Sequence, residues 1–298
     1  MSKDSMLSQF ESLQTALQRL EAAGIAEEAR QSMREALQQA ESLRQDYETE
    51  LGWLAEQIQE AQQTKNKFVS HVTHELRLPL TSIRGYTDLM RQGIIGPVNE
   101  QQLNFLNVIK NNVERMSALI SDLSDINYIE TGRMKLNQKL IFLDEHVEEA
   151  LVNFKARLAE KEQTLEVIIP ELTRPVYADP ARLVQIVSTL VSNSWKYTPK
   201  GGKISIRALE SGGWIKVEVT DTGVGISPAD QEKIFTQFFR SEDEAVREHP
   251  GWGLALHLAR RLVEAMGGEM GFESTLNQGS TFWFTLPTQP PQASAPAP

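Results

Sequence analysis

The sequence contains no cysteine among its 298 residues. This absence excludes disulfides, thiolate metal sites and a cysteine nucleophile, and it fits a reducing compartment. Any bound metal must therefore be held by oxygen or imidazole ligands. The sequence also lacks a run of the roughly 18 apolar residues that a membrane span needs, and it opens without a signal peptide. We therefore expect a cytoplasmic protein of about two domains with no membrane span.

Basic residues are scarce relative to acidic ones. The chain has 30 Lys and Arg against 40 Asp and Glu, a net charge of −10. Because phosphate backbones are bound by basic surfaces, this balance argues against nucleic acid as a partner. Much of the imbalance is local, since residues 1–60 hold five basic and twelve acidic side chains. That acidity indicates a solvated helical face rather than a catalytic site.

Residues 1–62 are rich in residues that favour helix, with one break near Gly24. Two apolar stripes follow helical spacing: Leu7, Phe10, Leu13, Leu17 and Leu20, then Met33, Leu37, Ala40, Arg44, Tyr47, Leu51, Leu54, Ile58 and Ala61. The second stripe alternates steps of four and three over about four heptads, which predicts a coiled coil. A single helix packed on the protein body is the alternative. Without a proline or glycine cluster to stop it, the helix should continue into Phe68.

His74 lies on that continuing helix next to an acid, Glu75. The apolar positions recur at three- and four-residue spacing and turn His74 toward the rim of the helix; they are Phe68, Val72, Leu76, Leu80 and Ile83. Glu75 can accept a proton from one ring nitrogen and leave the other free to attack an electrophile. We expect Pro79 to bend the helix, because proline lacks an amide donor and crowds the preceding turn.

A helical hairpin should follow, because turn residues after Arg91 separate the His74 helix from a second amphipathic helix. Its apolar side comprises Leu103, Leu106, Ile109, Val113, Met116, Ile120, Leu123 and Ile126. Two such stripes are too extensive for one chain to cover. A dimeric four-helix bundle would bury them.

The segment Phe68-Val-Ser-x-Val-Thr-His74-Glu75-Leu-Arg-x-Pro79-Leu-Thr-Ser-Ile83 resembles the phosphoacceptor box of the sensor histidine kinases of two-component systems. The resemblance implies that residues 63–131 form the dimerisation and phosphoacceptor domain, with His74 as acceptor. Residues 1–62 would then be a helical coiled-coil signalling segment. An ATP-binding domain is expected in the remainder.

After Gly132 the pattern changes to short β-type runs that alternate with helices, which predicts an α/β sandwich with helices on one face of a mixed sheet. The predicted strands are 135–142, 164–169, 175–178, 203–210, 214–220, 269–273 and 280–286, and the predicted helices are 144–161, 180–195, 228–235 and 254–266. We assign residues 132–287 to this domain. The closing residues 288–298 read as a disordered Pro-rich tail. The fold class is thus α plus α/β: coiled coil, helical-hairpin bundle, then sandwich.

Several motifs of this second half resemble the ATP-binding domain of histidine kinases, a fold shared with gyrase, Hsp90 and MutL. The first is Gln185-Ile-Val-Ser-Thr-Leu-Val-Ser-Asn193-Ser-Trp-Lys196-Tyr197-Thr-Pro. The amide oxygen of Asn193 suits Mg²⁺, a hard cation that also takes substrate phosphate oxygens. Lys196, one turn later on the same side, can reach a phosphate. The resemblance makes Tyr197 a further nucleotide contact.

The second motif, Asp221-Thr-Gly223-Val-Gly225-Ile226, ends a predicted strand. A carboxylate there can accept a hydrogen bond from the adenine amino group, and the glycines let backbone approach the base. The third motif, Ile234-Phe-Thr-Gln-Phe238-Phe239-Arg240, resembles the aromatic segment that edges the family's nucleotide lid.

The fourth motif is Gly251-Trp-Gly253-Leu254-Ala255-Leu256, which opens a helix. Backbone amides at a helix N-terminus, freed from side-chain bulk by glycine, can cradle phosphate. The loop 227–250 would then be a lid that closes over nucleotide. Thr281 is a candidate phosphate contact, the alternative being that it only caps a turn.

The resemblance implies a homodimeric protein histidine kinase that uses ATP and Mg²⁺. The Nε2 atom of His74 would attack the γ-phosphorus with Glu75 as proton acceptor, and the phosphoryl group would pass to an aspartate of a response regulator. A separate sensor protein could act through the N-terminal coiled coil. Leu78 stands where the family usually carries threonine or asparagine to orient a water. Since leucine cannot hydrogen-bond a water, weak phosphatase activity is expected.

The ATP-binding motifs also depart from the family pattern. Thr189 replaces an asparagine and Ser194 an alanine, changes expected to weaken metal or phosphate binding, and Ala255 replaces a glycine and narrows the phosphate approach. Together with Trp252, these departures keep an alternative open: a catalytically weak pseudokinase scaffold that docks response regulators. Another ATPase of the same fold would leave the box at His74 unexplained.

Overall fold

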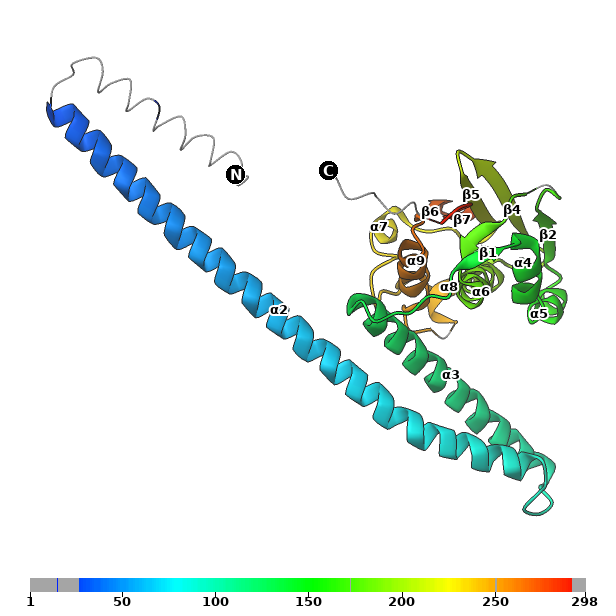
Figure 1. Ribbon diagram of the computed structural model, residues 1–298. Coiled ribbons are helices and arrows are strands. Elements are labelled where there is room, and N and C mark those ends of the chain that lie inside the picture. Colours follow the sequence, from blue (N-terminus) through cyan, green and yellow to red (C-terminus); the bar gives the residue numbers. More distant parts are fainter. Residues whose placement is uncertain (1–14, 16–26, 172, 250, 291–298) are drawn as a thin grey trace. The chain divides into compact units, whose positions relative to one another are not determined.

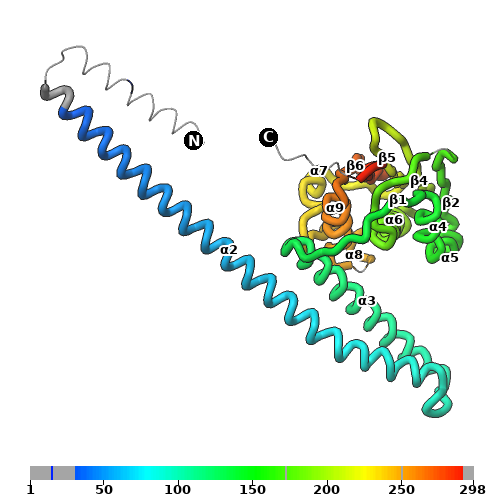
Figure 2. Tube along the Cα trace, viewed as in Figure 1, coloured from blue at the N-terminus to red at the C-terminus, as the bar shows by residue number. Residues whose placement is uncertain are grey.

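The computed structural model describes residue 15 and residues 27–171, 173–249 and 251–290 (Figures 1 and 2). The chain divides into two compact units, residues 1–67 and 68–298, each of which is described by itself. The predicted break near Gly24, the whole of the first apolar stripe and most of the Pro-rich tail lie outside the described residues.

Helix α2 (Glu27–Arg91) is continuous over 65 residues, which confirms that the N-terminal helix runs into the helix of His74. Pro79 lies inside it and does not end it. In the first unit the apolar stripe is exposed, at Tyr47, Leu51, Leu54 and Ile58. Exposed apolar positions at this spacing suit a coiled coil with a second chain, which stays a prediction. No helix among the described residues is both long enough and apolar enough for a membrane span.

The second unit opens with a helical hairpin, as expected. Its second helix is α3 (Glu100–Glu130), and a capping box formed by Asn99 and Gln102 starts it. The end of α2 packs against α3 through a small cluster of Leu80, Val113 and Ile120. Because two helices alone bury so little, the hairpin leaves much of its apolar surface exposed.

The remainder is an α/β sandwich built on a five-stranded sheet with the order β2-β4-β5-β7-β6. Strands β2 and β4 are parallel and the other pairs antiparallel. The strands are β2 (Thr164–Ile168), β4 (Lys203–Ser211), β5 (Trp214–Asp221), β6 (Met270–Thr275) and β7 (Gly279–Pro287), and a small separate sheet pairs β1 (Lys139–Ile141) with β3 (Val176–Ala178).

Helices cover one face of this sheet (Figure 1). They are α4 (Leu143–Leu151), α5 (Lys155–Glu160), α6 (Pro180–Tyr197) and α9 (Ala255–Ala265). Along β5 the side chains of Ile215, Val217 and Val219 are buried beneath the helices, whereas the alternating Lys216 and Glu218 face away. The alternation places Asp221, the last residue of β5, on the helix side of the sheet.

Two helix predictions were wrong in extent. The single helix expected over 144–161 is split into α4 and α5, because the weak helix formers Val152 and Asn153 make a turn. The helix expected over 228–235 stops at Gln231 as α7 (Pro228–Gln231). It is followed by turns in which a backbone amide donates to the carbonyl three residues earlier. A further helix, α8 (Glu244–Arg247), was not predicted.

The end of α3 joins the hairpin to the sandwich. Ile126 of α3 belongs to the same hydrophobic core as the sheet and its covering helices. Beside it, Arg182 in the first turn of α6 forms a bidentate ion pair with Asp125, with nitrogen–oxygen distances of 2.6 and 3.0 Å. The second unit therefore contains the helical hairpin that carries His74 and the sandwich as one packed body.

Candidate functional site

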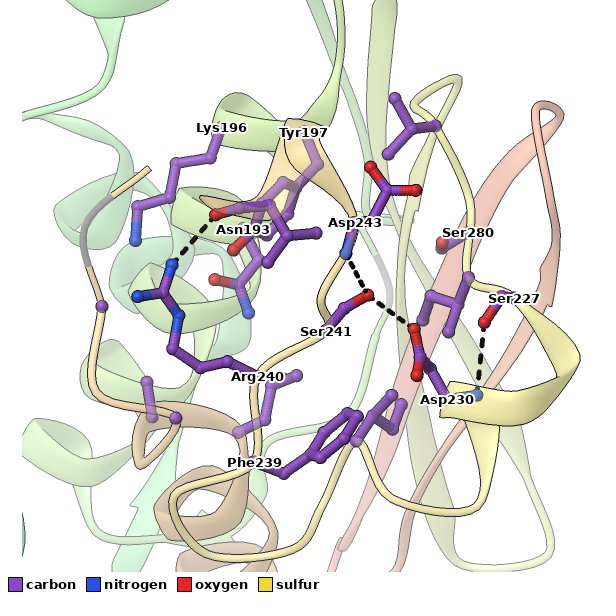
Figure 3. Close-up of a pocket in the computed structure, with 18 of the residues that line it drawn as sticks. Asn193, Lys196, Tyr197, Ser227, Asp230, Phe239, Arg240, Ser241, Asp243 and Ser280 are labelled. Atoms are coloured by element: carbon purple, nitrogen blue, oxygen red, sulfur yellow. Dashed lines mark hydrogen bonds between the residues drawn. The ribbon is translucent and has the colours of Figure 1, made fainter. Parts of the chain in front are cut away.

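A cavity of about 500 Å³ opens between α6, the ends of β5 and β7, and the segment from Val224 to Leu256 (Figure 3). Most of the predicted nucleotide contacts line it: Asn193, Lys196, Tyr197, Asp221, Gly225, Gly251, Gly253 and Leu254. Residues far apart in the sequence thus meet around one space.

Asp221 forms the base of the cavity and is nearly buried, at 7% exposure. Its Oδ1 accepts hydrogen bonds from the amides of Gly223 at 2.9 Å and Ser280 at 3.3 Å, and its Oδ2 accepts one from the Ser194 hydroxyl at 3.2 Å. Burial raises the pKa of this carboxyl, and the three donors oppose the rise. The result is a fixed hydrogen-bond acceptor at the base of the cavity.

At two positions near the cavity the backbone requires glycine. A Cβ at Gly223 would lie 2.7 Å from both Asp221 Oδ1 and the Tyr197 carbonyl oxygen, so no side chain fits where the chain passes the carboxylate. Gly253 has φ +68, in the left-handed region that glycine favours. Its carbonyl accepts a hydrogen bond from the Phe238 amide at 3.0 Å, which ties the glycine turn to the aromatic motif.

Positive charge gathers at the α6 side of the cavity. Lys196 and Arg240 approach this side together in Figure 3. The pKa of Lys196 is lowered, first by burial and then by the charges of Arg157 and Arg240. Ammonium and guanidinium groups that repel one another in a partly dry site would be stabilised by a polyanion. This end of the cavity therefore suits phosphate.

The segment predicted as a lid folds along the cavity. The guanidinium of Arg240 donates to the carbonyls of Val246 at 3.0 Å and His249 at 2.7 Å, and the His249 ring packs edge-on against Tyr197 at 5.8 Å. The Ser241 hydroxyl donates to Asp230 at 2.6 Å (Figure 3). Arg240, the last residue of the aromatic motif, thus both lines the cavity and holds the lid segment through these carbonyls.

Thr281 lies elsewhere. Its hydroxyl is 3.0 Å from that of Thr220, its cross-strand partner, and it is absent from the cavity lining, as is Gly223. The expected phosphate contact at Thr281 is therefore corrected: strand alternation turns this side chain to the opposite face, and the adjacent Ser280 lines the cavity instead.

The motif departures also fall in different places. Ala255 and Trp252 line the cavity, whereas Thr189 does not. Ser194 is 1% exposed and points at Asp221. Its hydroxyl therefore hydrogen-bonds to the carboxylate at the base of the cavity. The weaker metal or phosphate binding expected from Ser194 would have required this side chain at the phosphate end.

Sequence reasoning missed Asp122. This residue of α3 also lines the cavity, and burial followed by the charge of Asp125 raises its pKa to about 6. On the sequence it reads as one more polar position of an amphipathic helix. Only the packing of α3 against the sandwich brings it to the site, so no local signal could have found it.

His74 is well exposed, with 70% of its side chain accessible. Its Nδ1 lies 3.6 Å from a carboxylate oxygen of Glu75, which leaves Nε2 directed away from that partner. Leu78, one turn later, is also exposed. Among the described residues no group of three or more His, Cys, Asp or Glu side chains could hold a metal ion.

Comparisons with known proteins agree with these two centres. The profile of the His Kinase A (phospho-acceptor) domain matches residues 64–132, and that of the histidine kinase-, DNA gyrase B- and HSP90-like ATPases matches residues 178–290. The chain belongs to the two-component sensor histidine kinases. The histidine kinase resemblance drawn from the motifs is thereby confirmed.

Named relatives of this histidine kinase include the circadian input-output histidine kinase CikA of Synechococcus elongatus, 34% identical over 233 residues, which are 78% of this chain and 31% of CikA. BarA of Escherichia coli is 33% identical over 266 residues, 87% of this chain and 28% of BarA. The chain thus spans about a third of the length of these relatives.

Among solved structures, full-length ShkA in complex with AMPPNP is 25% identical with a TM-score of 0.61, and the match covers 78% of this chain and 47% of ShkA. The Acinetobacter baumannii histidine kinase AdeS is 24% identical with a TM-score of 0.53, and the match covers 72% of this chain and 98% of AdeS. The second likeness concerns the fold alone.

Proposed function

We propose that this histidine kinase uses ATP to phosphorylate His74 and then passes the phosphoryl group to an aspartate of a response regulator. The observation that carries the proposal is the cavity, whose lining combines a fixed carboxylate acceptor, Asp221, with the partly buried positive charge of Lys196. The first suits an adenine amino group and the second suits a triphosphate. The AMPPNP bound by ShkA supports a nucleotide in the related site.

The proposal gives each of these side chains a role. Nε2 of His74 attacks the γ-phosphorus, the bond to the β-phosphate bridging oxygen breaks, and ADP leaves. The imidazole then loses its Nδ1 proton to Glu75, the group that Nδ1 faces. Lys196, Arg240 and the Gly251–Gly253 turn hold the phosphates and neutralise their charge.

Mg²⁺ fits this donor set, because Asn193 presents an amide oxygen to the cavity and phosphate oxygens complete the usual shell. When bound there, the ion would neutralise charge on the phosphates. In the second reaction an aspartate oxygen of the regulator attacks phosphohistidine, the phosphorus–nitrogen bond breaks, and the imidazole regains a proton.

The domain assignment belongs to the same proposal: residues 1–62 for coiled-coil signalling, 63–131 for dimerisation and phosphoacceptance, and 132–287 for ATP binding. The exposed apolar faces of the hairpin and of α2 support a homodimer. They also leave room for a separate sensor protein on the coiled coil.

Transfer of radiolabel from [γ-³²P]ATP tests the activity. We expect acid-labile, base-stable label on the wild-type chain and none on His74→Ala, whereas His71→Ala, the exposed histidine one turn earlier, keeps it. Label that survives His74→Ala would refute the acceptor assignment. Absence of label on a wild type that binds ATP would favour the pseudokinase alternative. The departures Trp252 and Ala255 in the cavity lining are the residues that support that alternative.

We further propose that dephosphorylation of the regulator is weak, because Leu78 is 61% exposed beside His74 and offers no hydrogen bond to a water. Leu78→Thr should raise the rate at which phosphorylated regulator loses phosphate, with autophosphorylation little changed. Rapid dephosphorylation by wild type, without a gain in Leu78→Thr, would contradict this.

A further inference from the structure

Ser194 occupies a position that the catalytic proposal does not use. It directly follows Asn193 on α6, but its side chain is buried at 1% exposure and its hydroxyl donates to Oδ2 of Asp221. The phosphate end of the cavity is lined by Asn193 and Lys196 instead. The serine therefore acts on the residue at the base of the cavity.

The hydrogen-bonding capacity of Asp221 is almost filled. A carboxylate offers about four lone-pair positions. The amides of Gly223 and Ser280 take two on Oδ1, and the Ser194 hydroxyl takes one on Oδ2. One position remains on Oδ2, and because Asp221 lines the cavity, a ligand can reach it. All three partners are donors, so each favours the ionised carboxylate over the neutral acid.

We propose that Ser194 is a specificity-determining residue, which keeps Oδ2 of Asp221 a pure acceptor so that the cavity takes 6-aminopurine nucleotides and rejects 6-oxopurine nucleotides. The proposal rests on the proposed function in one respect, that Asp221 receives the nucleotide base. It adds the residue that enforces the choice of base.

The chemistry of the two purines makes the distinction. Adenine presents an N–H donor at position 6, which matches the remaining lone pair of Oδ2. Guanine and hypoxanthine present an oxygen there, which would face a carboxylate oxygen in a dry site with no proton between them. If Asp221 were neutral, its O–H could donate to that oxygen. Burial already favours the neutral acid, and loss of the Ser194 hydroxyl removes one of the three groups that oppose it.

The test measures equilibrium binding of ATP, GTP and ITP to the full chain and to Ser194→Ala. We expect the ratio of ATP to GTP affinity to fall about tenfold in Ser194→Ala, the usual effect of one hydrogen bond to a charged group, with the same trend for ITP. Ser194→Cys should behave like Ser194→Ala, because a thiol has similar bulk but donates weakly. It also provides a second variant if the alanine leaves a destabilising void.

The control is Ser205→Ala, on the sheet face away from the helices, which should keep the wild-type ratio. An unchanged ratio in both Ser194 variants, or equal losses for all three nucleotides, would overturn the inference and leave Ser194 a packing residue.

Asp221→Asn separates this inference from the proposed function. We expect it to lose the preference for ATP. If Asp221→Asn loses that preference while both Ser194 variants keep it, the inference about Ser194 alone fails. If wild type binds no ATP, or Asp221→Asn discriminates as wild type does, the assignment of Asp221 as base acceptor fails, and the inference fails with it.

Discussion

At the scale of single residues, Asp122 carries the clearest electrostatic cost. It sits on α3, lines the cavity, and has its pKa raised to about 6 from an ordinary value of 3.8 by burial and by Asp125. The folded protein thus holds a proton on Asp122 more tightly than the unfolded chain does. Stability should therefore fall as pH rises from about 4 to about 6 and lose no more from this group above that range.

We predict that Asp122→Asn stabilises the protein at pH 7 by about 2 kcal/mol, allowing for partial exposure, and by much less at pH 4.5. Urea unfolding at the two pH values measures this. Asp46→Asn, an exposed carboxylate of α2, is the matched control and should show little difference. Equal effects of Asp122→Asn at both pH values would contradict the prediction.

Residue-level reasoning from the sequence succeeded where a motif fixes the backbone and failed where strand alternation or tertiary packing decides. Asp221 and the glycine turn reach the cavity as expected. Thr281 does not, because one step along a strand reverses the face, and Ser194 serves the carboxylate rather than the phosphate end.

At the scale of elements, the contact between α3 and α6 is set by the ion pair of Asp125 and Arg182. Asp125 is 8% exposed, and Arg182 reaches it with two nitrogens. Breaking a buried pair from one side leaves an uncompensated charge, which costs more than the pair contributes. The pair therefore matters chiefly for keeping α3 in one position on the sandwich.

We predict that Arg182→Ala lowers the free energy of unfolding by about 3 kcal/mol, and that adding Asp125→Ala recovers part of the loss. Lys110→Ala, which breaks an exposed pair with Glu114 at 3.6 Å, should cost less than about 1 kcal/mol. Chemical denaturation of the three variants measures these differences. A loss in Arg182→Ala no larger than in Lys110→Ala would refute the prediction.

The elements themselves were largely predictable, because period-two and period-3.6 patterns are local. All seven strands and the long helices occur near their expected places. The errors lie between Val152 and Phe154 and around the lid, where short turns replace helix. There the chain direction depends on what each side chain packs against, which local periodicity does not contain.

At the scale of the whole molecule, the hairpin is incomplete as a single chain. Its own cluster is small, while apolar side chains of both helices stay more than 40% exposed, among them Leu76, Ile83, Met90, Ile109 and Met116. An apolar surface of this kind on two helices is what a four-helix bundle covers.

We therefore predict that Ile109→Glu converts a dimer into a monomer, because it places a charge in the bundle core. Val152→Glu, at an apolar position of the sandwich that is more exposed than Ile109 (63% against 41%), should leave the dimer intact. Sedimentation equilibrium distinguishes the two states. A monomeric wild type, or a dimer that tolerates Ile109→Glu, would contradict the bundle.

Fold class and family could be predicted from the sequence because both halves of the chain carry motifs that resemble the family's. Their order along the chain, the box at His74 followed by the ATP-site motifs, is also the family's order. The participation of α3 in the cavity could not be predicted, since Asp122 and Asp125 acquire their roles only where hairpin and sandwich share a core.

The chain has five tryptophans, all within the described residues, and Trp252 is the one that lines the cavity, where it is 57% exposed. A nucleotide that fills the cavity displaces water from that indole and leaves the surroundings of the other four unchanged. The natural fluorescence of the protein should therefore contain its own occupancy signal, and substituting Trp252 alone should remove that signal.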